Sequence, residues 1–178
     1  LHVQTSPESD VATPVAQPAL NKEAITVIAM AEQYIAQPAA MMGVTSAWEE
    51  VLALYRQAGL INRANFDRLM KTVTERHFQP FIGAGAQLAR SRDEMLRAPP
   101  GSRLIFIASA QPAEGGRQMV HAMVVTAWGQ AVGVNNQPVG GQAGWGKMDL
   151  AALKVNADSR HGLVIESRSG GLQCIIAA

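Results

Sequence analysis

The sequence has little cysteine, little charge and few aromatic residues. A single cysteine, Cys174, excludes a disulfide within the chain, and the 4 histidines lack the spacing of a metal site. The 15 basic and 14 acidic residues give a net charge of +1 with no basic block, so nothing indicates a nucleic-acid partner. No apolar run reaches the roughly 18 residues that a membrane-spanning helix needs. We therefore expect no membrane span, no metal and no other cofactor.

What remains is the composition of one folded domain. The chain has 178 residues, 48% hydrophobic and 16% charged, which is enough to bury a sizeable core. Residues 1–20 contain prolines, serines and threonines with little periodicity, and they predict a linker or disordered tail before a domain at 21–178. Because the chain begins with Leu1 rather than methionine, we expect a fragment or a processed product.

The first half of the domain has helical periodicity. Asn21 and Asn62 stand where helix caps are expected, and Gly59 is a plausible helix end. The apolar spacing predicts helices over residues 22–35, 41–58, 63–78 and 81–97, the last weakened at its start by two glycines.

After Pro99-Pro100-Gly101 the periodicity becomes that of strands. Strands are predicted at 103–109, 118–128 and 131–134, followed by a glycine-rich loop at 140–146 and a short helical or turn segment around 148–153. A closing hairpin is predicted from 162–167 and 172–176. Helices first and an antiparallel sheet second indicate an α+β fold.

The strand at 118–128 carries His121 in its middle, between residues that are apolar or small on both faces. Such a strand is covered on both sides, and the charge state of a histidine within it depends on its neighbours. A hairpin through Gly129 could bring the amide of Asn135 close to the ring. By itself such a histidine is more often a core residue than a catalytic base, and Asn135-Asn136 before Gln-Pro is by default a turn.

Three stretches resemble one family. Met41-Met-Gly-Val-Thr-Ser-Ala-Trp48 looks like a nucleophile helix, and Gly115-Gly116 followed by Val120-His121-Ala-Met-Val124 looks like the segment of a catalytic base. Val134-Asn-Asn-Gln-Pro-Val-Gly140 with Met148–Leu153 is similar to the segment of the third catalytic residue. Together they resemble the papain-like cysteine proteases, most closely the effector proteases of bacterial type III secretion.

The resemblance implies a papain-like fold with a helical N-terminal half packed on the sheet. It implies a secreted effector or toxin that hydrolyses a peptide or related acyl bond in a target protein. His121 would be the base, Asn135 the group that orients it, and Gln37 the oxyanion donor. The nucleophile position falls on Met41, or on Ala40 if the alignment slips by one residue. We expect the start of this helix to lie within about 5 Å of the His121 ring.

The chain departs from the family at the nucleophile, because neither methionine nor alanine can attack a carbonyl. It is either a variant in which Ala40 replaces a cysteine, or a natural protein that lost the chemistry and binds a protein or peptide. In both cases the chain as written is expected to be inactive. Cys174 is most simply a buried apolar residue, although a His-Asn-Cys order occurs in other cysteine proteases and keeps it as an alternative nucleophile.

Overall fold

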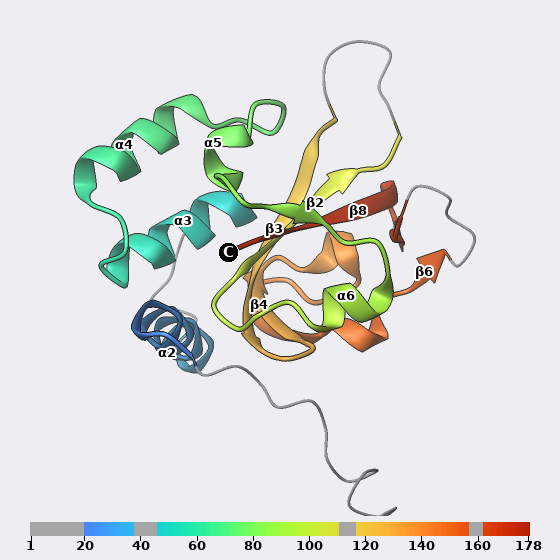
Figure 1. The fold of residues 1–178 in the computed structure, drawn as a ribbon, viewed down its shortest axis with the longest axis horizontal. Coiled ribbons are helices and arrows are strands. Elements are labelled where there is room, and N and C mark those ends of the chain that lie inside the picture. Colours follow the sequence, from blue (N-terminus) through green and yellow to red (C-terminus); the bar gives the residue numbers. More distant parts are fainter. Residues whose placement is uncertain (1–19, 38–45, 111–116, 157–161) are drawn as a thin grey trace, which may run out of the picture.

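The computed structural model describes residues 20–37, 46–110, 117–156 and 162–178. Within them, helices come first and an antiparallel sheet follows, which confirms the predicted α+β class (Figure 1). In chain order the elements are α2 (Lys22–Ala36), α3 (Ala47–Gln57), α4 (Arg63–Thr72), α5 (Gln79–Ile82), β1 (Gln87–Leu88), α6 (Arg92–Leu96), β2 (Arg103–Ala108), β3 (Met119–Ala127), β4 (Gln130–Val134), η2 (Gln137–Val139), β5 (Trp145–Asp149), η3 (Leu150–Ala152), β6 (Val155–Asn156), β7 (Val164–Ser167) and β8 (Gly170–Ala177).

The first two helices begin at side-chain caps. The Asn21 side chain accepts a hydrogen bond from a backbone N–H of the first turn of α2 at 2.7 Å, as predicted. Before α3, the Glu49 carboxylate accepts from the backbone N–H of Ser46 at 3.2 Å and from its hydroxyl at 2.8 Å. The helix predicted at 41–58 is thus confirmed for residues 47–57, but its predicted start is wrong, because Ser46 is the N-cap of α3 and has an extended backbone. Residues 41–45 lie outside the described residues.

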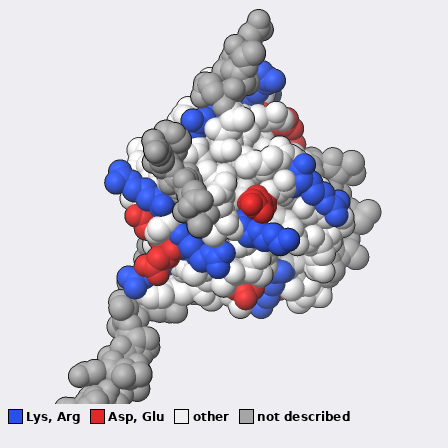
Figure 2. All heavy atoms as spheres, turned by 90° about the vertical axis from the view of Figure 1, so that its right-hand side faces the viewer, with Lys and Arg blue, Asp and Glu red and all other residues white. Residues whose placement is uncertain are grey.

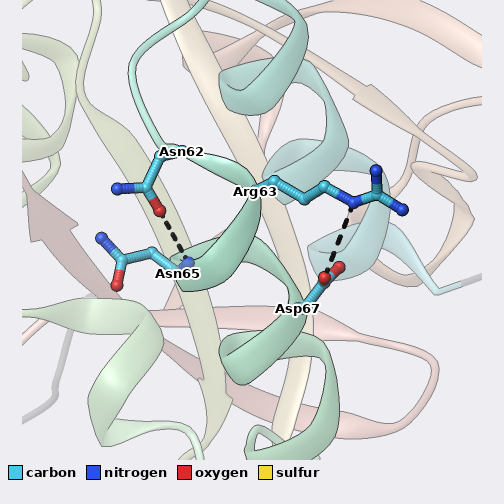
Figure 3. Close-up of polar contacts among 4 residues, drawn as sticks. All are labelled: Asn62, Arg63, Asn65 and Asp67. Atoms are coloured by element: carbon cyan, nitrogen blue, oxygen red, sulfur yellow. Dashed lines mark hydrogen bonds and ion pairs between the residues drawn. The ribbon is translucent and has the colours of Figure 1, made fainter.

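Helix α4 begins as predicted and ends early. Asn62 caps its first turn, and Arg63 pairs with Asp67 at 3.9 Å on its exposed surface (Figure 3). The helix predicted at 63–78 is too long, because Val73 adopts an extended backbone conformation after the last helical residue. The apolar side of α4 packs against the helical core without burying any residue completely.

Residues 81–97 do not form the predicted helix. Gly83 and Gly85 have φ angles of +77° and +80°, a left-handed conformation that ends α5 and turns the chain. Strand β1 then pairs with β8. Ser91 caps the short helix α6 that follows. The helical spacing of the apolar residues was therefore misleading here, because the left-handed φ angles of the two glycines end the helix.

All described strands pair in an antiparallel sheet of order β5-β4-β3-β2-β8-β7-β6, with β1 added on β8. Strands β5 and β6 lie at opposite ends of this order, yet only residues 150–154 join them. So short a segment cannot span a flat sheet of seven strands, and the sheet is accordingly curled (Figure 1). The predicted strands at 103–109, 118–128 and 131–134 and the closing hairpin are confirmed, whereas the predicted loop at 140–146 ends earlier, where β5 begins.

The sheet separates two apolar cores. Ala122 and Val124 of β3 face α2 and α3 and belong to the core between these helices and the sheet. Met123 and Val125 point the other way, into a second core on the opposite face. All four are fully buried. Because side chains alternate along a strand, the face of Met123 is also the face of His121.

Candidate functional site

His121 lies on the face of β3 that turns away from α3. It is 2% exposed, and its ring lies 6.1 Å from that of Phe106, its partner on β2. Helices α2 and α3 pack against the opposite face through the core that contains Ala122. The imidazole is therefore part of the second core. The expected approach of the helix start to the ring is not seen in the described residues, because Trp48 in the first turn of α3 packs in the core of Ala122. Residues 40 and 41 lie outside the described residues.

Asn136, not Asn135, is the partner of His121. The Nε2 atom of His121 lies 2.8 Å from Oδ1 of Asn136, which is completely buried. Asn135 is exposed, and its φ of +53° is the left-handed conformation that asparagine tolerates. This single residue turns the chain after β4, so the next side chain points back into the sheet. The predicted bond between Asn135 and the ring is thus wrong by one residue.

Asn136 forms hydrogen bonds with both its side-chain amide and its backbone. Its Nδ2 donates to the carbonyl oxygens of Gly133 at 3.2 Å and Gly146 at 3.1 Å, two residues paired across β4 and β5. Its backbone N–H donates to Gln142 at 2.8 Å, and its carbonyl accepts from Gly141 at 2.8 Å. Asn136 therefore fixes the start of the loop that follows β4.

Glycines make room for this side chain. A Cβ on Gly133 would lie 2.7 Å from Oδ1 of Asn136, and one on Gly141 would lie 2.4 Å from its Cβ. Neither glycine has a positive φ, so close approach rather than backbone freedom explains them. Glycines at 133, 141 and 146 around one asparagine were the sequence signal that could have singled out Asn136.

The hydrogen bonds define the tautomer of His121. Because the Asn136 amide nitrogen already donates to two carbonyls, its oxygen must face the ring and accept from Nε2–H. In the neutral ring the lone pair then lies on Nδ1. Burial lowers the pKa of His121 to about 4, against the opposing effect of the bond to Asn136. The ring is therefore neutral at pH 7.

The remaining candidate residues do not assemble around the ring in the described part of the chain. Gln37, the expected oxyanion donor, is the exposed C-terminal cap of α2. Ala40 and Met41 lie outside the described residues. Cys174 is completely buried, and burial raises its pKa to about 12.

Cys174 and His121 are both paired with Phe106, from opposite sides. Two strand spacings, about 10 Å, therefore separate their backbones, which is too far for a direct hydrogen bond across Phe106. The interpretation of Cys174 as a small buried apolar residue is confirmed.

A cavity of about 510 Å³ lies beside the loop that Asn136 holds. One wall is the loop 137–141. The others come from Met148 of β5, Ala152 of η3, Lys154, the last two residues of β7 and Arg168 directly after it. The cavity thus lies where the two ends of the curled sheet approach each other. His121 does not line it, but Asn136 connects the ring directly to its wall.

No family profile, curated protein or solved structure matches the chain. In the described residues, no group of three or more His, Cys, Asp or Glu side chains could hold a metal ion. No described helix has the length and hydropathy needed to cross a bilayer.

Proposed function

We propose that this domain binds a protein or a peptide and does not cleave it. The proposal keeps the relationship to secreted effector proteases of the papain type and assigns the chain to a branch without catalysis. The observation that carries it is the burial of the His121–Asn136 pair on the face of the sheet opposite α3. A catalytic base must reach the proton that it removes, and a ring that is 2% exposed within an apolar core does not reach a substrate.

The chemistry of the chain supports the same proposal. The thiolate is the nucleophile of cysteine proteases, and the one thiol of this sequence is buried with a pKa raised to about 12. The neutral imidazole, whose pKa is lowered to about 4, is a weak base. What the pair does instead is to hold the loop 137–141, which is a wall of the cavity. A preformed cavity with a fixed wall suits binding.

An array of synthetic peptides tests this function. The complete chain is applied to the array, and eluted peptides are analysed by mass spectrometry for both binding and cleavage. We expect saturable binding of a subset of peptides, with every bound peptide recovered intact. A folded His121→Gln variant should bind the same peptides, because glutamine can still donate to Asn136. The proposal is rejected if the unmodified chain cleaves any peptide, or if it binds no peptide of the array.

One observation favours a second function, cysteine protease activity in a natural protein that has cysteine at residue 40 or 41. The hydrogen bond from Nε2 of His121 to an asparagine leaves Nδ1 as the basic atom of the ring. In Cys-His-Asn sites the asparagine amide fixes the tautomer of the histidine in the same way. Such an enzyme would be a secreted effector acting on a target protein. Introducing cysteine at each of the two positions tests this alternative.

A further inference from the structure

The cavity beside loop 137–141 has walls that the fold holds in place. Asn136 anchors this loop through its side chain and backbone, and the backbone N–H of Gly140 donates to Gln137 within it. The other wall is joined to the sheet, because the N–H of Glu166 in β7 donates to the Lys154 carbonyl at 2.8 Å. Both walls are thus held by hydrogen bonds, and the cavity does not have to form when a ligand arrives.

The surface of the cavity combines an apolar part with a basic rim. Pro138, Val139, Met148 and Ala152 provide apolar contacts. Lys154 and Arg168, both exposed, provide positive charge, and Glu166 is the one acidic side chain of the lining. The lining therefore has a formal charge of +1, from two basic side chains and one acidic one.

Among the described residues, the two basic side chains have no ion-pair partner. The ion pairs between described residues are Arg63–Asp67, Arg97–Asp93 and Lys147–Glu32, so neither Lys154 nor Arg168 takes part in one. On the face shown in Figure 2, acidic and basic side chains are interspersed rather than gathered into a patch of one sign. Lys154 and Arg168 are both exposed, so a ligand can reach their charges.

We propose that this cavity binds an extended acidic peptide segment, with carboxylates at Lys154 and Arg168 and an apolar side chain against Pro138 and Ala152. This inference rests on the proposed binding function and names the class of partner. The volume of about 510 Å³ is that of a ligand site for a few side chains. The alternation of acidic and apolar side chains follows from the extended conformation, in which neighbouring side chains point in opposite directions.

Fluorescence polarisation with two labelled peptides tests the inference. The acidic probe is Gly-Ser-Asp-Val-Asp-Leu-Ser-Gly, and its basic counterpart has lysine in place of both aspartates. The complete chain should bind the acidic probe in preference to the basic one. The double variant Lys154→Glu, Arg168→Glu should bind the acidic probe about tenfold more weakly, since each change turns an attraction into a repulsion.

A control variant separates this local effect from net charge. Lys22→Glu with Lys71→Glu changes the net charge by the same amount on α2 and α4, where both lysines are exposed. It should bind the acidic probe within about twofold of the unchanged chain. Thermal unfolding of both double variants verifies that they are folded.

The outcomes distinguish this inference from the function on which it rests. If the acidic probe binds both double variants equally, or if the basic probe is preferred, the inference is wrong. If in addition the array identifies other peptides whose binding is unaffected by changes at Lys154 and Arg168, the binding function stands and its site lies elsewhere. If neither probe nor any array peptide binds, both proposals fail.

Discussion

His121 and Asn136 meet inside the protein through a hydrogen bond of 2.8 Å between Nε2 and Oδ1, and neither side chain is more than 2% exposed. The bond links β3 to the loop after β4. The amide also donates to the paired glycines of β4 and β5. One buried asparagine thus connects three strands and a cavity wall. Leaving such a buried amide without its partners lowers the free energy of unfolding by more than the paired amide contributes to it.

Removing this asparagine should destabilise the domain. Asn136→Ala leaves the Nε2–H of His121 and two glycine carbonyls without their partner, at a cost of about 2–3 kcal/mol in the free energy of unfolding. Asn135→Gly is the matched control, since glycine adopts the φ of +53° and the Asn135 side chain is exposed. Urea unfolding of both variants measures the difference. Equal effects of the two changes would contradict the assignment of Asn136.

The glycine next to this amide should be coupled to it. Gly133→Ala places a Cβ 2.7 Å from Oδ1 of Asn136, so it should destabilise the domain by about 1–3 kcal/mol. In an Asn136→Ala background the clash with Oδ1 is gone, while Met123 at 3.1 Å and the Ala122 carbonyl at 3.3 Å remain. The double-mutant cycle should therefore give a coupling energy of at least about 0.5 kcal/mol. Strict additivity would show that Gly133 and Asn136 do not touch.

The elements predicted correctly from the sequence are those that local chemistry decides. The side chains of Asn21 and Asn62 cap their helices by accepting a hydrogen bond from the backbone N–H three residues further on. The strand around His121 follows from an unbroken apolar run. The failures have two causes: α4 ends early at Val73, whose backbone is extended, and elsewhere left-handed residues redirect the chain. Gly83 and Gly85 end a helix that the apolar spacing favoured.

The prediction of the His121 partner failed for a similar reason. Asn135 was chosen because it comes first after the strand, yet its own left-handed conformation directs the following side chain to the ring. Which face His121 occupies depends on an irregular register between β2 and β3 near Phe106, and a shift of one residue moves every side chain to the other face. No motif in a single sequence reports such a shift. The assignments of Gln37, Ala40 and Met41 came from resemblance and stay predictions.

Stability should depend on pH through His121. Its pKa is lowered to about 4 in the folded protein, whereas an unfolded histidine titrates near 6.5. Between these values the unfolded chain binds more protons, so stability is fully present above about pH 6.5 and is lost as the pH falls toward 4. The loss is about 3 kcal/mol at most.

Urea unfolding between pH 4 and 8 measures this slope. A folded His121→Gln variant should lose the part of the slope that belongs to the ring, while His77→Gln, at an exposed position, should keep it. An unchanged slope in His121→Gln would mean that the ring is not buried as described.

The native thiol should be inert. Cys174 is completely buried with a pKa raised to about 12, so iodoacetamide at neutral pH should modify it only through unfolding. We expect a rate at least about a hundredfold below that of free cysteine, rising to the free value in urea. Mass spectrometry follows the modification. Rapid labelling of the native chain would restore Cys174 as a nucleophile candidate, and Cys174→Ala would then identify any activity that depends on it.

An inert Cys174 provides the background for deciding between binding and hydrolysis. Cysteine is placed at residue 40 and, separately, at residue 41. A thiol in a protease site is activated by the start of a helix and by a nearby imidazole, so it should react with iodoacetamide faster than free cysteine near neutral pH. From the burial of His121 we expect no such acceleration in either variant.

The discriminating control is His121→Gln in each cysteine variant. If one of the two cysteines reacts faster than free cysteine and the gain disappears with His121→Gln, the ring reaches the thiol and the protease alternative replaces the binding proposal. If a gain persists without His121, a group other than the imidazole activates the thiol, and the imidazole has no catalytic role. If neither cysteine exceeds free cysteine, His121 and Asn136 act as a structural pair that positions the cavity wall.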